Sequence, residues 1–136
     1  GEHVREKLKA RGYSCTLVNA RFVKPLDTDM IDRLCRSHKL IVTLEENVLR
    51  GGMGMCATQY IHEHHPEIHV IQVALPDAYV EHGNVSLLRE MLGIDSDSVI
   101  KRIFTEYLDP YDSHGNMKIQ NSFDCPNSTE KERRDP

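Results

Sequence analysis

The stretch of the chain that decides the fold is Leu40-Ile41-Val42-Thr43-Leu44-Glu45-Glu46-Asn47. Its first five residues form a short, nearly continuous apolar run, which is typical of a strand covered on both faces of a parallel sheet. Polarity changes abruptly after Leu44, so we expect the strand to end there. A second run of this kind occupies residues 70–75 and is closed by Pro76-Asp77.

Helical patterns lie around these two runs. Asp27 or Thr28 is placed to cap a helix that reaches Ser37, because either side chain can accept from the free amides of a first turn. Glycines lead into another helix over residues 53–64, which Pro66 stops. Three more helices are expected over residues 2–11, over residues 85–92 with Asn84 as the cap, and from Ser96 or Ser98 onward.

The fold class follows from the order of these elements. Residues 13–20 are β-prone and supply a third expected strand, beside residues 40–44 and 70–75. Strands that alternate with helices predict an α/β fold, in which helices cover both faces of a mainly parallel sheet as three α/β/α layers. Because residues 110–136 are polar and lack an apolar period, we expect a domain over residues 1–109 and a disordered tail over 110–136.

Composition narrows the classes of partner. The 136 residues carry a net charge of -4 and no Trp, which argues against a nucleic-acid-binding face. No apolar run approaches the roughly 20 residues of a membrane span, so no membrane partner is expected. The cysteines are too widely spaced for a zinc or redox motif. We interpret them as reduced residues of a cytoplasmic protein, the first three in its core: Cys15, Cys35, Cys56 and Cys125.

Polar residues gather where the first apolar run ends. The carboxyl edge of a parallel sheet is where open α/β folds place ligands and interfaces. Adjacent carboxylates on a strand point to opposite faces, so a contact surface is favoured over an acid-base pair. In the glycine turn we expect positive φ at Gly52, where a β-branched residue would be costly. The candidate contact or anion-binding residues are Glu45, Glu46, Asn47, Gly51, Gly52, Gly54 and Asp77.

Two more specific motifs, one for a dinucleotide and one for zinc, match residues 52–65 only in part. The segment Gly52-Met53-Gly54-Met55-Cys56-Ala57 fits a relaxed dinucleotide-binding pattern with Asp77 as the acidic partner, but residues 46–50 separate it from its strand. The tract His62-Glu63-His64-His65 lacks the zinc protease spacing, because position 66 is proline. We therefore assign no catalytic, cofactor-binding or metal-binding residue. A free-standing module that docks a small anion or a partner at residues 45–54 remains an alternative.

Four motifs resemble, in the same order, the C-terminal domain of 1-deoxy-D-xylulose-5-phosphate synthases over about residues 2–108. They are Arg21-Phe22-Val23-Lys24-Pro25-Leu26-Asp27, Val42-Thr43-Leu44-Glu45-Glu46-Asn47 with Gly51-Gly52-Met53-Gly54, Leu75-Pro76-Asp77, and Glu81-His82-Gly83. The resemblance implies a transketolase-type third domain of a transferase that depends on thiamine diphosphate and magnesium. That enzyme joins pyruvate to glyceraldehyde 3-phosphate with loss of carbon dioxide, for isoprenoid and thiamine synthesis.

The resemblance also implies where the rest of the machinery lies. The family binds thiamine diphosphate and its metal between the first two domains, so no cofactor is expected in this chain. The implied partners are the N-terminal and central domains of the same enzyme, within a homodimer. The third domain packs against them and is expected to be inactive alone.

One family element has no counterpart in this sequence. Family members have a strand just before the helix that begins here at about Gly1. In their sheet this strand lies between the segments that match residues 13–20 and 40–44. Either the chain is a fragment truncated on its N-terminal side, or its sheet closes the gap by pairing those two segments directly.

Overall fold

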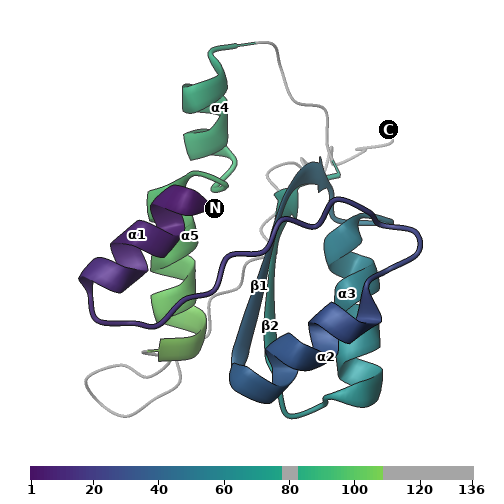
Figure 1. Ribbon diagram of the computed structural model, residues 1–136. Coiled ribbons are helices and arrows are strands. Elements are labelled where there is room, and N and C mark those ends of the chain that lie inside the picture. Colours follow the sequence, from purple (N-terminus) through teal and green to yellow (C-terminus); the bar gives the residue numbers. More distant parts are fainter. Residues whose placement is uncertain (78–82, 109–136) are drawn as a thin grey trace, which may run out of the picture.

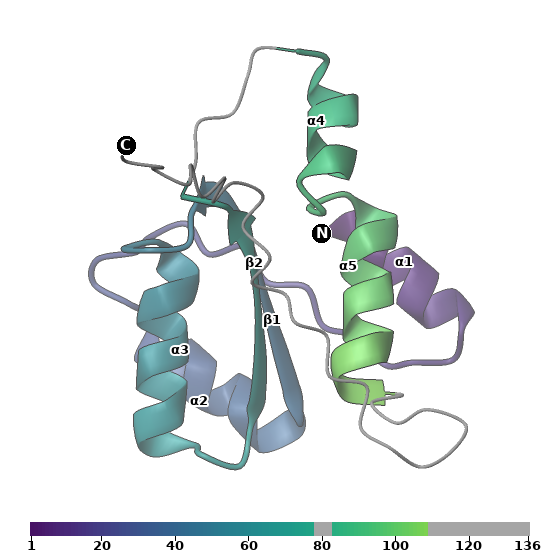
Figure 2. The same cartoon turned by 180° about the vertical axis from the view of Figure 1, so that it is seen from behind.

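The computed structural model describes residues 1–77 and 83–108, and its helices lie on two sides of a small sheet (Figures 1 and 2). The sheet consists of the parallel strands β1 (Leu40–Val48) and β2 (His69–Leu75). The helices are α1 (Glu2–Ala10), α2 (Thr28–Ser37), α3 (Met53–His64), α4 (Val85–Met91) and α5 (Ser96–Ile103), which continues as a π-helical turn, Phe104–Leu108. The expected tail lies outside the described residues, as does most of the Glu81-His82-Gly83 motif.

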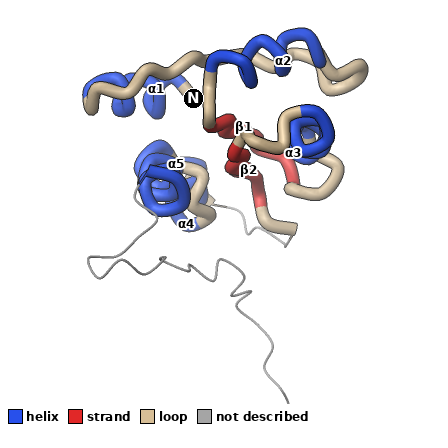
Figure 3. Tube along the Cα trace, turned by 90° about the horizontal axis from the view of Figure 1, so that it is seen from below, coloured by secondary structure: helices blue, strands red, loops and turns tan. Residues whose placement is uncertain are grey.

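The layers confirm the predicted α/β class. Helices α1 and α5 cover one face of the sheet and α2 and α3 cover the other, as the view along the strands shows (Figure 3). None of the helices in the described ranges is long and apolar enough to cross a membrane.

Helix boundaries agree with the local signals in the sequence. The side chain of Asp27 accepts from the amide of Met30 at 2.9 Å and caps α2, and Asn84 caps α4 in the same way. The helix expected over residues 53–64 is present with those bounds. Helix α5 differs in one detail, because Asp95, rather than a serine, accepts from its first free amides. A carboxylate satisfies two donors there, which a single hydroxyl does less well.

Apolar residues form a core on each face of the sheet. Alternate residues of β2 point to opposite faces, so Ile71 and Val73 pack with α1 and α5, whereas Val70 packs on the α2 and α3 side. Cys35 is buried in the second cluster with Ile61 and Ile68. The interpretation of the first three cysteines as core residues holds fully for Cys35 only, because Cys15 and Cys56 are half-buried. Cys125 lies outside the described residues.

Strand β1 continues past the expected end. It includes the polar residues 45–47 and resumes regular pairing where Val48 lies opposite Leu75, after an irregularity in the register. The prediction that the strand stops at Leu44 was therefore wrong. Backbone pairing does not require apolar side chains at a sheet edge, where polar groups reach solvent.

The expected strand at residues 13–20 is absent, so the described sheet has two strands instead of three. This segment passes from α1 to α2 beyond the outer edge of β1 (Figure 3). The suggestion that residues 13–20 pair directly with β1 was therefore wrong. Side chains that favour extended backbone do not supply a hydrogen-bonding partner, and at residues 13–20 the described chain offers none.

A polar cluster joins α2 to the end of α3. The Oδ1 atom of Asp32 accepts from the hydroxyl of Tyr60 at 3.0 Å and lies 2.8 Å from Nε2 of His65. The hydrogen bond with His65 is the main cause that lowers the pKa of the Asp32 carboxyl below its ordinary value. Burial, followed by the bond to Asp32, raises the pKa of Tyr60. The carboxylate form of Asp32 therefore stabilises the contact between these helices.

Removing this carboxylate should make the free energy of unfolding depend less on pH under acidic conditions. Because the pKa of Asp32 is lower in the folded chain than in the unfolded chain, its contribution is present above about pH 4 and is lost as the pH falls through the folded value. Urea unfolding from about pH 2 to pH 7 should show that the free energy of unfolding falls more steeply with decreasing pH for the wild type than for Asp32→Asn. Asp29→Asn, at an exposed position of the same helix, is the control. Superimposable profiles for wild type and Asp32→Asn would contradict this assignment.

Candidate functional site

Glu45 holds the start of α3 from the end of β1. Its Oε2 accepts from the amide of Met53 at 3.0 Å, and its Oε1 accepts from the amide of Gly54 at 2.9 Å. The first amides of a helix have no partner within the helix, and the positive end of the helix favours a carboxylate. Gly52 is the N-cap and has no side chain to supply an acceptor. Glu45 therefore performs the capping from a distant position in the sequence.

The glycines around this carboxylate are required by space. A Cβ at Gly52 would collide with the carboxylate of Glu45, and a Cβ at Gly54 would lie 2.6 Å from Oγ1 of Thr43. Gly52 has φ of -74°, so the expectation of positive φ there was wrong. Positive φ occurs at the neighbouring Gly51, with φ of 78°. In this turn, Gly51 is needed for its positive φ, whereas Gly52 and Gly54 leave space for the carboxylate of Glu45.

The other predicted residues lie at the same edge with separate partners. Glu46 is exposed and pairs with Arg89 of α4, while the side chain of Asn47 accepts from the amide of Val48 at 2.9 Å. Asp77 is exposed just beyond β2. The structure thus gathers the predicted set at the carboxyl edge of the sheet. It does not bring Glu45 and Glu46 onto one point, as the alternation of strand side chains leads us to expect.

Several residues at this edge were not identified from the sequence. Arg89 reaches Glu46 from a helix far along the chain, and Thr43 contacts the Gly54 position by tertiary packing, so no local spacing identifies either. Leu49 and Met55 flank the glycine turn and are 41% and 46% exposed. The amide of Gly51 points to the sulfur of Met55 at 3.3 Å. We call residues 49–55 the edge turn; it presents apolar surface that a search for polar motifs does not detect.

The described residues do not fit thiamine diphosphate or its metal. Within residues 1–77 and 83–108, no group of three or more His, Cys, Asp or Glu side chains could hold a metal ion. His65 is engaged with Asp32, and His64 stacks on Tyr60 with ring centres 4.2 Å apart. A diphosphate or other anion at the start of α3 would have to displace the carboxylate of Glu45. The start of α3 is therefore a turn whose shape is fixed by hydrogen bonds to Glu45 within the chain.

Loss of the Glu45 carboxylate should destabilise the fold measurably. Glu45→Ala leaves the amides of Met53 and Gly54 without their acceptor and should lower the free energy of unfolding by about 1–2 kcal/mol, the usual cost of a lost helix cap. Glu46→Ala is the matched control on the adjacent residue, since an exposed ion pair contributes about 0–1 kcal/mol. Urea unfolding of the two variants measures the difference. Equal losses would show that Glu45 is not the cap.

A double-mutant cycle tests the origin of the glycine requirement. Gly52→Ala should cost about 1–3 kcal/mol, because the added methyl group collides with the carboxylate of Glu45. Most of that loss should disappear in a Glu45→Ala background, where the colliding group is gone. Gly51→Ala is the control, because its strain comes from positive φ and no atom lies within 4 Å of the added carbon. Additive losses for Gly52→Ala and Glu45→Ala would contradict the steric explanation.

Known proteins share this fold and these sequence features. The family described as "Transketolase, C-terminal domain" matches residues 2–99. The chain is 46% identical over 101 residues to 1-deoxy-D-xylulose-5-phosphate synthase from Lachnoclostridium phytofermentans and 36% identical over 101 residues to the synthase from Clostridium tetani. Each alignment covers 74% of this chain and 16% of the relative, so the chain spans about one sixth of the length of these proteins.

A solved structure supports the same assignment. The chain superposes on a protein described as "Split gene transketolase, inactive beta4 tetramer" with a TM-score of 0.69 and 25% sequence identity, over 75% of this chain and 33% of that chain. Together with the family match over residues 2–99, these similarities show that the chain belongs to the transketolase C-terminal domain family.

Proposed function

We propose that this chain is the third domain of a 1-deoxy-D-xylulose-5-phosphate synthase, acting in the cytoplasm. The observation that carries the proposal is the 46% identity over 101 residues to such a synthase. The complete enzyme condenses pyruvate with glyceraldehyde 3-phosphate and releases carbon dioxide, for isoprenoid and thiamine synthesis. Because the described residues do not fit thiamine diphosphate or magnesium, we assign both to the N-terminal and central domains.

The role of the domain in that enzyme is to pack against its other domains and across a homodimer. The edge turn supports this proposal, because Glu45 fixes its shape from inside while Leu49 and Met55 remain exposed. Apolar side chains that gather beside polar ones on a rigid turn are typical of contact surfaces. The exposed Asn47 and Asp77 supply polar groups at the rim of the same edge.

We further propose that the domain is inactive alone. The relative of known structure is described as an inactive tetramer of a split-gene transketolase. In the described part of this chain, Glu45 and Glu46 have separate structural partners and do not form a convergent pair for acid-base catalysis. Activity therefore requires residues from other domains.

Complementation tests the proposal directly. The chain is mixed with the separately produced N-terminal and central domains of the Lachnoclostridium phytofermentans synthase, and carbon dioxide release is measured with pyruvate and glyceraldehyde 3-phosphate. We expect activity only in the mixture. Leu49→Asp should reduce the recovered activity about tenfold, a loss of about 1.4 kcal/mol at the contact. Val85→Asp, at an exposed apolar position on α4, is the matched control. Anion binding without restored activity would support the docking-module alternative instead.

A further inference from the structure

Strand β2 has an outer edge, on the side away from β1, with backbone groups that the described sheet does not pair. The amide of His69 donates to the carbonyl of Lys39 at 3.1 Å, so residue 69 directs its backbone groups toward β1. Backbone groups of successive residues in a strand point to opposite edges. The residues whose amides and carbonyls point away from β1 are therefore Val70, Gln72 and Ala74. We call these groups the β2 outer edge.

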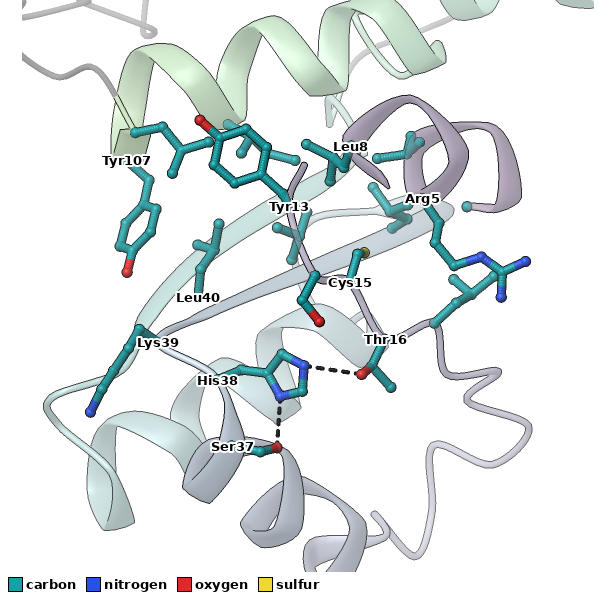
Figure 4. Close-up of a pocket in the computed structure, with 18 residues that line it drawn as sticks. Arg5, Leu8, Tyr13, Cys15, Thr16, Ser37, His38, Lys39, Leu40 and Tyr107 are labelled. Atoms are coloured by element: carbon teal, nitrogen blue, oxygen red, sulfur yellow. Dashed lines mark hydrogen bonds between the residues drawn. The ribbon is translucent and has the colours of Figure 1, made fainter. Parts of the chain in front are cut away.

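The opposite edge of the sheet, on β1, is less accessible to a second folded copy. Residues 13–17 run beside that edge (Figures 3 and 4). The Nε2 atom of His38 lies 3.0 Å from Oγ1 of Thr16, and its Nδ1 lies 2.8 Å from Oγ of Ser37 at the end of α2 (Figure 4). This bridge ties the segment to α2, so a strand of another molecule would meet residues 13–17 before it reached β1. Pairing between copies is therefore expected at the β2 outer edge.

The sequence of β2 favours such pairing. The strand is His69-Val70-Ile71-Gln72-Val73-Ala74-Leu75, without Pro, Lys, Arg, Asp or Glu. Uncharged, apolar segments of this length are typical of strands that pair between chains. Charged side chains, proline and bulges are the usual features that keep an edge strand from doing so. The irregularity in this sheet lies in β1, between Leu44 and Val48. Strand β2 therefore carries none of these protective features itself.

A side chain of α5 contacts the β2 outer edge. The Nη1 atom of Arg102 donates to the carbonyl of Gln72 at 2.7 Å. The Nε atom of the same guanidinium donates to Oε1 of Glu106, four residues further along the chain. Both side chains are only partly exposed, so this second bond holds the guanidinium in place beside the strand. Arg102 therefore occupies a carbonyl that an added strand would need.

The position of this carbonyl matters for pairing between identical chains. Two copies related by a twofold axis present the same surface to each other, and their strands would run antiparallel with one residue opposite its own counterpart. Gln72 is the middle residue of β2 and the middle one of the three that form the β2 outer edge. Such pairing would therefore centre on Gln72, and both copies would have to release Arg102 at once.

We propose that Arg102 is an autoinhibitory contact, which keeps β2 from pairing antiparallel with β2 of a second copy of this chain. Glu106 is a positioning residue, because it holds the guanidinium at the carbonyl of Gln72. Loss of the guanidinium frees the acceptor at the centre of the β2 outer edge and allows the two strands to pair. The inference does not depend on the enzymatic activity or on the homodimer proposed above.

Sedimentation equilibrium of the 136-residue chain gives the first test. Arg102→Met keeps the apolar stem and removes the guanidinium, so its dissociation constant for self-association should be at least about tenfold below that of the wild type. Lys101→Met removes the same charge at an exposed neighbouring position and is the control, with a wild-type constant. Glu106→Gln should lower the constant by a smaller factor, and it decides the test if Arg102→Met does not fold. A wild-type constant for folded Arg102→Met would overturn the proposal.

Hydrogen exchange identifies the surface that associates. In Arg102→Met, raising the protein concentration should slow exchange at the amides of Val70, Gln72 and Ala74 about tenfold. Gln72→Pro in the same background removes the central donor, which does not face β1, and should restore the wild-type dissociation constant. Gln72→Ala in that background keeps the donor and should leave the association unchanged. Association that leaves the three amides unprotected, or that persists with proline at position 72, would overturn the proposal.

Discussion

The carboxylate of Glu45 is the constraint on which the arrangement of α3 depends. It satisfies two amides at the start of that helix, and it occupies the space that a side chain at position 52 or 54 would need. One acidic residue thus explains two glycines that a sequence pattern alone assigns to backbone freedom. With its start fixed, α3 places Ile61 in the core and brings His65 against Asp32 of α2. The layer formed by α2 and α3 is therefore anchored at the end of β1.

Sequence predicts the elements whose causes lie within one turn of helix. The caps at Asp27 and Asn84 act over a few residues and were predicted from those residues alone. Residues 13–20 show the opposite case. Their composition favours extended backbone, but a strand is defined by its partner, and the described chain does not place one beside them. The end of β1 was predicted wrongly for a related reason, since pairing with β2 resumes at Val48, after the polar residues 45–47.

The candidate site was predictable in position and less so in detail. Parallel strands end at a common edge, so the gathering of Glu45, Asn47 and Asp77 follows from topology. Glu45 was predicted to contact an anion or a partner, whereas in the structure its carboxylate accepts from two amides at the start of α3. Arg89 could not be anticipated, because its contact with Glu46 depends on how α4 is placed in space.

The two strands differ in how far helices cover them. Ile71 and Val73 of β2 are buried against α1 and α5, whereas Leu40, Val42 and Leu44 of β1 are only partly buried on that face. On the other face, Ile41 of β1 is also only partly buried. The core therefore packs chiefly on β2, whereas β1, which ends in the residue that caps α3, keeps its apolar side chains partly accessible.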